Sequence, residues 1–249
     1  MSLFNKTESP ELQQLISRWD TYLIKLKDRY HEILKEAEEP LNNVIANIQY
    51  DTVIIHNIKM GLHNQTVDQL TKKADEGWSK MQGEMNKLGM SWNSITEQSN
   101  KLNTMKDWLA FEFQSFEIKL YARAARQIYE NVQKHIDINK LHRCTQCGAE
   151  LPIKIYSFMS INLKCDSCGS VNTYQPDDRI RALEFYVLNH LAEEQAWPMK
   201  VKAKNDRNAQ KEYYRIYYGY LMEMVPDKKE FYEREMNERI SNPIFRLGF

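Results

Sequence analysis

The four cysteines of this chain constrain its fold more than any other feature. All of them lie between positions 144 and 168 of a 249-residue sequence, as two C-x2-C pairs that are each followed directly by glycine. The pattern C-x2-C-x17-C-x2-C falls in the spacing range of four-cysteine zinc sites. Two intervening residues let both thiolates of a pair reach one ion, and the glycine allows the positive φ that a tight turn needs. The sequence therefore predicts one Zn2+ held by Cys144, Cys147, Cys165 and Cys168.

Short strand signals accompany the two cysteine pairs. Leu151, Ile153 and Ile155 alternate along the chain, as do Ile161 and Leu163, and "SVNTY" follows the second pair. This arrangement of strands and cysteine turns resembles the zinc-ribbon family over about residues 140–176. In that family two cysteine turns on a small antiparallel sheet hold one zinc ion. The resemblance implies that all four cysteines are ligands.

Other interpretations of the cysteines stay open beside the zinc site. The thiols could be simply buried, or a C-x2-C pair could be redox-active, although that motif is normally followed by a helix rather than a strand. Zinc-bound thiolates can also act as a redox switch when they are exposed. Four cysteine ligands leave no position for water, so we expect a structural rather than a hydrolytic zinc. His142, two residues before Cys144, is interpreted as a neighbour of the site rather than a ligand.

The sequence predicts long helices in the N-terminal half, because the whole chain contains only eight glycines and seven prolines. Ser9, Pro10 and Glu11 predict a helix start, and a heptad seam follows from Leu12 to Ala37. Pro40 predicts a new or kinked helix that reaches Gly61, with "TVIIHNI" as its most buried part. We expect a turn at "GLHNQTV", a third helix to Leu88 weakened by Gly77 and Gly83, and a fourth from Trp92 to about His135.

Three helices are expected after the cysteine segment. Asp177 and Asp178 predict the start of the first, and Pro198 is expected to lie past its end. A basic connector then precedes two helices over "EYYRIYYGYLMEMV" and "PDKKEFYEREMNERI". The tyrosines of the first of these have helical spacing, which favours packing or a partner-facing surface over base stacking.

These elements predict a mainly α protein. The expected architecture is an elongated helical bundle or coiled coil with an inserted small antiparallel β zinc ribbon. The predicted domains are a helical coiled coil or bundle over residues 1–138, the zinc ribbon over 139–176 and a helical segment over 177–249.

Function is narrowed mainly by what the sequence lacks. It carries no nucleotide-binding loop, nucleophile elbow or zinc-protease helix, and 34 basic residues balance 34 acidic ones. No targeting leader or membrane span is recognisable, so we expect a cytoplasmic protein that is not an enzyme and has no membrane partner. The layout is similar to bacterial coiled-coil proteins with a terminal four-cysteine ribbon, some of which act as chaperones or adaptors.

The leading hypothesis is a non-enzymatic, zinc-containing scaffold or adaptor that binds protein partners, with self-association as one form of this binding. The alternative is a nucleic-acid-binding or transcription-associated factor. In that case phosphates, or an acidic partner, would contact the basic cluster Lys200, Lys202, Lys204, Arg207 and Lys211.

Overall fold

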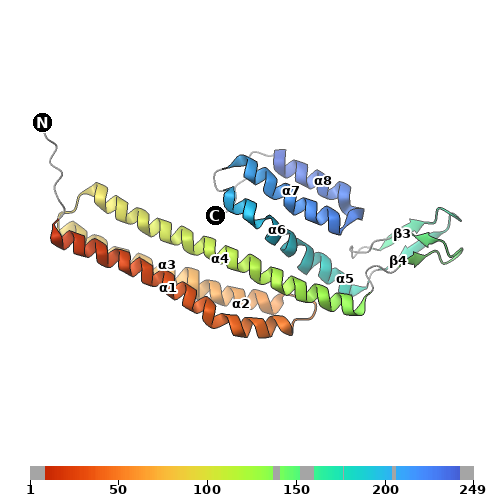
Figure 1. Ribbon diagram of the computed structural model, residues 1–249, viewed down its shortest axis with the longest axis horizontal. Helices are drawn as coiled ribbons and strands as arrows, with labels where there is room; N and C mark the ends of the chain where they lie inside the picture. The colour runs from red at the N-terminus through yellow and green to blue at the C-terminus, as the bar shows by residue number, and fades with distance from the viewer. Residues whose placement is uncertain (1–8, 137–140, 152–159, 176, 204–205, 242–249) are drawn as a thin grey trace. The chain divides into compact units, whose positions relative to one another are not determined.

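The computed structural model describes residues 9–136, 141–151, 160–175, 177–203 and 206–241 (Figure 1). Within these ranges the protein is mainly α-helical with two small antiparallel two-stranded sheets, which confirms the predicted fold class. The described residues form two compact units: 9–43 with 56–117, and 44–55 with the described residues between 118 and 241. The predicted domain boundaries after residues 138 and 176 stay a prediction.

Helix α1 (Pro10–Ala46) begins where the sequence predicts but ends later. The Ser9 hydroxyl accepts a hydrogen bond from the Leu12 amide at 3.3 Å. The heptad seam is buried from Leu12 to Ile33, except that Leu23 is buried in place of the predicted Tyr22. The sequence predicted a new or kinked helix at Pro40; there is no new helix, because α1 passes through this residue, and the kink stays a prediction. Pro40 lies on the exposed side, and the buried stripe continues past it at Leu41. The packing of that stripe therefore outweighs the lost backbone hydrogen bond.

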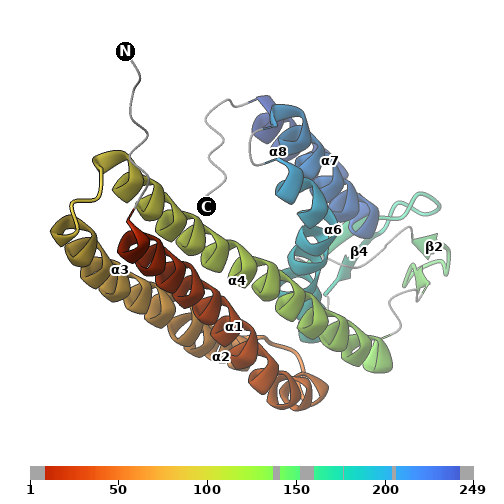
Figure 2. The ribbon, with the colours of Figure 1, turned by 60° about the vertical axis from the view of Figure 1, so that its left-hand side comes forward.

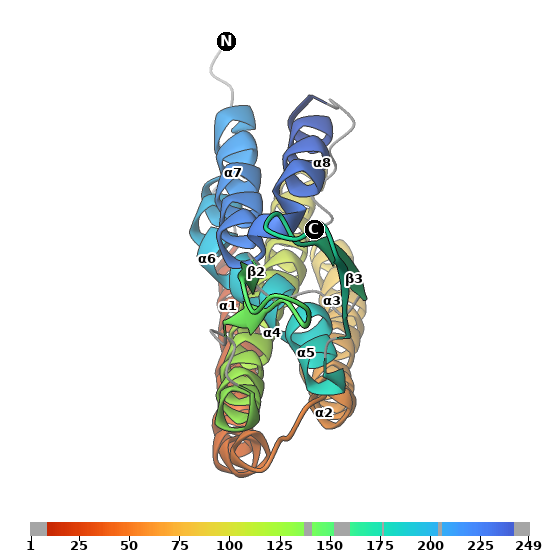
Figure 3. The same cartoon turned by 90° about the vertical axis from the view of Figure 1, so that its right-hand side faces the viewer.

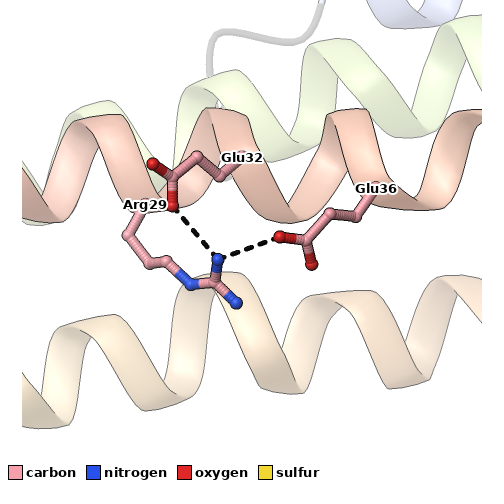
Figure 4. Close-up of polar contacts among 3 residues, drawn as sticks. All are labelled: Arg29, Glu32 and Glu36. Atoms are coloured by element: carbon pink, nitrogen blue, oxygen red, sulfur yellow. Dashed lines mark hydrogen bonds and ion pairs between the residues drawn. The ribbon is translucent and has the colours of Figure 1, made fainter.

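A charged cluster lies on the solvent side of α1 (Figure 4). Arg29 Nη1 lies 3.1 Å from both Glu32 Oε2 and Glu36 Oε1. The side-chain hydrogen bonds to the two carboxylates raise the pKa of Arg29. All three side chains are largely exposed, so this cluster keeps one face of α1 in water and adds little to stability.

The chain then reverses through α2 (Val53–His63), a π-helical turn (Asn64–Asp68) and α3 (Gln69–Lys87). The predicted turn at "GLHNQTV" was wrong, because the helix is continuous there. Leu62, Thr66 and Leu70 stay buried in successive steps of four, and the Thr66 hydroxyl donates to the Leu62 carbonyl. The expectation that "TVIIHNI" is buried holds for Thr52 and Ile55 but was wrong for Val53, which is 60% exposed, and Ile54, which is 49% exposed.

The first unit is a bundle of α1, α2, α3 and the first part of α4 (Trp92–His135) (Figure 2). Helix α4 has the predicted bounds, and the Ser91 hydroxyl accepts from the Ser94 amide at 3.2 Å. Contacts between Asp20 and Lys101 and between Tyr30 and Trp108 show that α1 and α4 run parallel. Its largest fully buried side chains are Tyr30, Leu41, Leu70, Met85, Met105 and Leu109.

The second unit contains the rest of α4, the segment 44–55, the cysteine segment and the C-terminal helices. Asn131 of α4 donates to the Ile48 carbonyl at 2.6 Å, which attaches the segment 44–55. After the cysteine segment come α5 (Asp178–Ala182), a π-helical stretch (Leu183–Leu188) and α6 (Asn189–Lys202). The expectation that Pro198 follows the helix was wrong. Its ring is exposed, and buried Ala196 and Trp197 hold α6 together on the other side.

The last helices, α7 (Arg207–Met224) and α8 (Lys229–Ser241), lie side by side (Figure 3). A short 3-10 turn (Pro226–Lys228) joins them. Tyr213, Tyr214 and Tyr218 of α7 are buried in a cluster with α6 residues, which confirms the packing interpretation of these tyrosines. Among the described residues, α8 contributes no buried side chain.

None of the helices that the structure describes has both the length and the apolar character needed to cross a membrane.

Candidate metal centre

The cysteines lie in two β-hairpins with the same backbone design. The first hairpin pairs β1 (His142–Arg143) with β2 (Glu150–Leu151), and the second pairs β3 (Ile161–Lys164) with β4 (Val171–Tyr174). Strands β2, β3 and β4 contain residues of the predicted strand signals, whereas β1 was not predicted. Ile153 and Ile155 lie outside the described residues.

The turns of the two hairpins contain equivalent backbone hydrogen bonds. The Cys144 amide donates to the Ala149 carbonyl and the Cys165 amide to the Ser170 carbonyl, both at 2.8 Å. The glycines close each turn with φ of 74° at Gly148 and 73° at Gly169, a region that disfavours any side chain. The glycine after each cysteine pair is therefore required by the backbone of the turn.

The two turns bring all four sulfurs together. The Sγ atoms lie within 4.8 Å of one another, with 3.7 Å between Cys144 and Cys168 and 3.6 Å between Cys147 and Cys165. A disulfide needs about 2.05 Å, so these are free thiols. A tetrahedral ion with metal–sulfur distances of about 2.3 Å has sulfur–sulfur edges of about 3.8 Å. The two short edges fit this geometry, so the cluster could hold a metal ion.

Two polar side chains beside the cluster were not found from the sequence. The Ser170 hydroxyl lies 3.1 Å from Cys144 Sγ and 3.0 Å from Cys168 Sγ. The Asn172 side chain is buried, and its Nδ2 donates to Cys144 Sγ at 3.4 Å. Its Oδ1 accepts from the amide and hydroxyl of Thr145 at 2.9 and 3.0 Å. Asn172 thus connects the second hairpin to the first; the polar "SVN" within a strand signal was the available clue.

These hydrogen bonds act on the acidity of the thiols. The Ser170 hydroxyl and the Cys147 amide lower the pKa of Cys144 to about 5. The hydroxyl and amide of Ser170 also lower the pKa of Cys168. At Cys147 the Ala149 amide stabilises the thiolate, but hydrogen bonds with the sulfurs of Cys168 and Cys165 outweigh it and raise the pKa to about 12. Thiolate character is therefore concentrated on the Cys144–Cys168 edge.

The surroundings of the sulfurs are also uneven. Cys144 and Cys165 are buried with Leu151 in a small apolar cluster, whereas Cys147 and Cys168 are exposed. His142 is not part of the sulfur cluster, because its ring packs edge-on against Tyr174 at a centroid distance of 4.7 Å. This contact is a further link between the first and second hairpins.

The predicted basic cluster is spread over two helices. Lys200 and Lys202 lie on α6, Arg207 and Lys211 lie on α7, and Lys204 is outside the described residues. The Lys200 side chain is only 12% exposed: its Nζ lies 3.6 Å from Glu193 Oε1 and packs over the rings of Trp197 and Tyr213. Lys202 and Arg207 are exposed. Contact of these residues with a polyanion stays a prediction.

Fold and site together define a class: a mainly helical protein that carries a four-cysteine cluster suited to a metal ion, on two small hairpins. Comparison with protein-family models, with curated proteins and with solved structures gave no match to this chain.

Proposed function

We propose that the protein is a non-enzymatic scaffold or adaptor stabilised by one structural zinc ion. Cys144, Cys147, Cys165 and Cys168 hold the zinc, and the helices provide surfaces for protein partners, including a second copy of the chain. The observation that carries the proposal is the convergence of four cysteine sulfurs within 4.8 Å.

The donor set favours zinc and a structural role. Soft thiolate ligands in a tetrahedral arrangement select zinc among the common divalent ions. Four protein ligands fill the coordination sphere, so no position is left for a water or a substrate. The ion would instead stabilise a segment whose core is small among its described residues, where the apolar cluster holds Cys144, Leu151 and Cys165 with Ala149 packed against it.

Exposed apolar side chains on the helices support a role in protein binding. Trp92 is 76% exposed at the start of α4, and Leu88 is 41% exposed just before the Gly89 turn that precedes it. Tryptophan is among the residues most enriched at the energetic centres of protein interfaces. A tryptophan held in water at a helix turn therefore fits a contact residue better than a core residue.

The zinc part of the proposal is tested by metal analysis of the purified full-length protein. We expect one zinc per chain by mass spectrometry of the metal content, and strong sulfur-to-metal charge-transfer bands after exchange into Co2+. A Cys165→Ser variant should lose both signals, while Ser167→Ala, which changes an exposed residue of the same turn, should keep them. A zinc-free protein whose four thiols all titrate freely would overturn the zinc assignment.

The scaffold part of the proposal is tested by measuring self-association in solution and by measuring binding to nucleic acids. Self-association measured by analytical ultracentrifugation should weaken in Trp92→Ser and not in Ile24→Ser, which changes another exposed apolar residue of the first unit. Fluorescence anisotropy against single- and double-stranded DNA and RNA should show no tight binding at low salt. Tight binding that weakens steeply with salt would favour the nucleic-acid alternative instead.

A further inference from the structure

The two hairpins have equal backbones but different side chains around the sulfurs. Superposing them by sequence places Ala149 opposite Ser170, directly after the paired glycines, and Leu151 opposite Asn172, two residues further on. The first hairpin therefore offers two apolar side chains, and the second offers a hydroxyl and an amide. Both polar groups point at sulfurs, so among the described residues the hydroxyl and side-chain amide donors to the cluster come from the second hairpin.

The four sulfurs consequently accept different numbers of hydrogen bonds. Cys144 accepts from Asn172 Nδ2 and shares the single Ser170 hydroxyl hydrogen with Cys168. Cys147 and Cys168 hold equivalent exposed positions, and each accepts one backbone amide, from Ala149 and Ser170 respectively. The difference between these two exposed sulfurs is the hydroxyl, which Cys168 has within 3.0 Å and Cys147 lacks because residue 149 is alanine.

From this asymmetry we infer that Cys147 is the modification site of the centre, where small disulfide compounds react first. The inference rests on the proposed metal site. Metal binding makes all four cysteines thiolates, so their relative reactivity is set by access to solvent and by nucleophilicity rather than by protonation. A hydrogen-bond donor stabilises the charge on sulfur and lowers its nucleophilicity. Of the two exposed sulfurs, Cys147 is the one without a hydroxyl donor.

The reaction is a thiol–disulfide exchange. Cys147 Sγ attacks one sulfur of the disulfide: a new S–S bond forms, the old S–S bond breaks, and the other half of the reagent leaves as a thiolate that takes a proton from water. No further oxidant is needed, because the reagent itself is reduced. The modified Cys147 can no longer serve as a thiolate ligand, so the hairpins lose one of the four contacts that hold them together. A neighbouring thiolate, such as Cys165 at 3.6 Å, can then displace the added group and leave a Cys147–Cys165 disulfide.

The test uses the zinc-loaded full-length chain and 2-hydroxyethyl disulfide, a small neutral probe that the nearby Asp166 carboxylate does not repel. With limiting reagent and short times, peptide mass mapping should find the adduct on Cys147 about two- to threefold more often than on Cys168. It should exceed the adducts on buried Cys144 and Cys165 by at least about tenfold. Cys168 reacting first or equally would overturn the inference.

Two single-atom variants separate the hydroxyl from other differences between the hairpins. Ala149→Ser gives the first hairpin the missing hydroxyl and should bring Cys147 down to the rate of Cys168. Ser170→Ala should raise Cys168 to the rate of Cys147. Unchanged ratios in both variants would show that the hydroxyl does not set the order and would overturn the inference.

Metal removal distinguishes failure of the inference from failure of the proposed function. After chelation the hairpins should lose their order, and the four cysteines should react at similar rates. Persistence of the Cys147 preference without metal would overturn the inference, because the order would then belong to free thiols. A wild-type chain that binds no zinc in the metal analysis would instead remove the proposed function itself.

Discussion

The cysteine segment and the first helical unit differ in what stabilises their folds. The helical unit buries a continuous series of large side chains along α1, α3 and α4, from Leu12 through Tyr30 to Leu109. Among their described residues, the two hairpins bury only Cys144, Leu151, Cys165 and Asn172. Stability in the helices is therefore distributed over many contacts, whereas in the hairpins it is concentrated on four sulfurs and whatever they bind.

The largest expected effect is loss of the metal from the hairpins. Chelation, or Cys165→Ser, should remove a binding free energy of about 10–16 kcal/mol apparent, the range of small zinc modules. Hydrogen exchange followed by mass spectrometry should show lost protection in residues 141–151 and 160–175 and unchanged protection in α3 and the first part of α4. The Ser167→Ala control should exchange like the wild type. Equal loss of protection in the helices would show that the two regions are not independent in stability.

The second prediction changes the helical bundle instead of the hairpins, by creating a cavity in its core. Leu109 is 0% exposed, so Leu109→Ala should lower the free energy of unfolding of the helices by about 2–5 kcal/mol, as measured by urea denaturation. Zinc content should stay at one ion per chain. Ile24→Ala changes an apolar residue that is 59% exposed and should alter stability by no more than about 0.5 kcal/mol. Loss of zinc from Leu109→Ala would contradict the separation of the two regions.

A smaller effect is expected from two glycines within α3. A Cβ at Gly77 would lie 2.6 Å from Cε1 of Tyr22, whereas a Cβ at Gly83 meets nothing within 4 Å. Gly83→Ala should therefore stabilise the bundle by about 0.5–1 kcal/mol through helix propensity. In Gly77→Ala the same gain is outweighed by displacement of the Tyr22 ring, at a cost of about 1–3 kcal/mol. Thermal unfolding should move the two variants in opposite directions, and equal shifts would mean that Tyr22 yields without cost.

The same contrast explains what could be predicted from the sequence. The ligand residues were readable because a metal turn fixes residue type and spacing locally: two cysteines, two residues between them and a glycine at positive φ. The long helices were readable from periodicity, and α4 has the predicted bounds. Both signals are contained within one short stretch or one repeating period.

The errors came where tertiary packing overrides a local signal. Pro40 and Pro198 look like helix ends, but each ring lies on an exposed side while buried neighbours hold the helix together. The predicted turn near Gly61 is a π-helical turn that keeps Leu62, Thr66 and Leu70 in the core. Ser170 and Asn172 were missed because their roles depend on the approach of the second hairpin to the first, which no local pattern encodes.

The smallest expected effect concerns the helix that follows the hairpins. Asp177 caps α5 by accepting from the Arg179 amide at 2.9 Å, and its carboxylate pairs with the Arg179 guanidinium. These hydrogen bonds from the side chain and amide of Arg179 lower the pKa of Asp177 to about 2. Asp177→Asn keeps a capping oxygen but loses the ion pair, so it should cost at most about 1 kcal/mol at neutral pH, since the pair is partly exposed.

The stability difference between the wild type and Asp177→Asn should depend on pH, in a direction set by the lowered pKa of Asp177. Because the folded-state pKa lies below the ordinary value of about 3.9, the stabilisation is fully present above about pH 4 and is lost as the pH falls towards 2. Urea denaturation at several pH values should thus show wild type and Asp177→Asn converging at pH 2. Protons compete for the thiolates of the hairpins and release their metal at acid pH, so the remaining difference belongs to the helices. A difference that persists at pH 2 would mean that the capping geometry, not the charge of Asp177, starts α5.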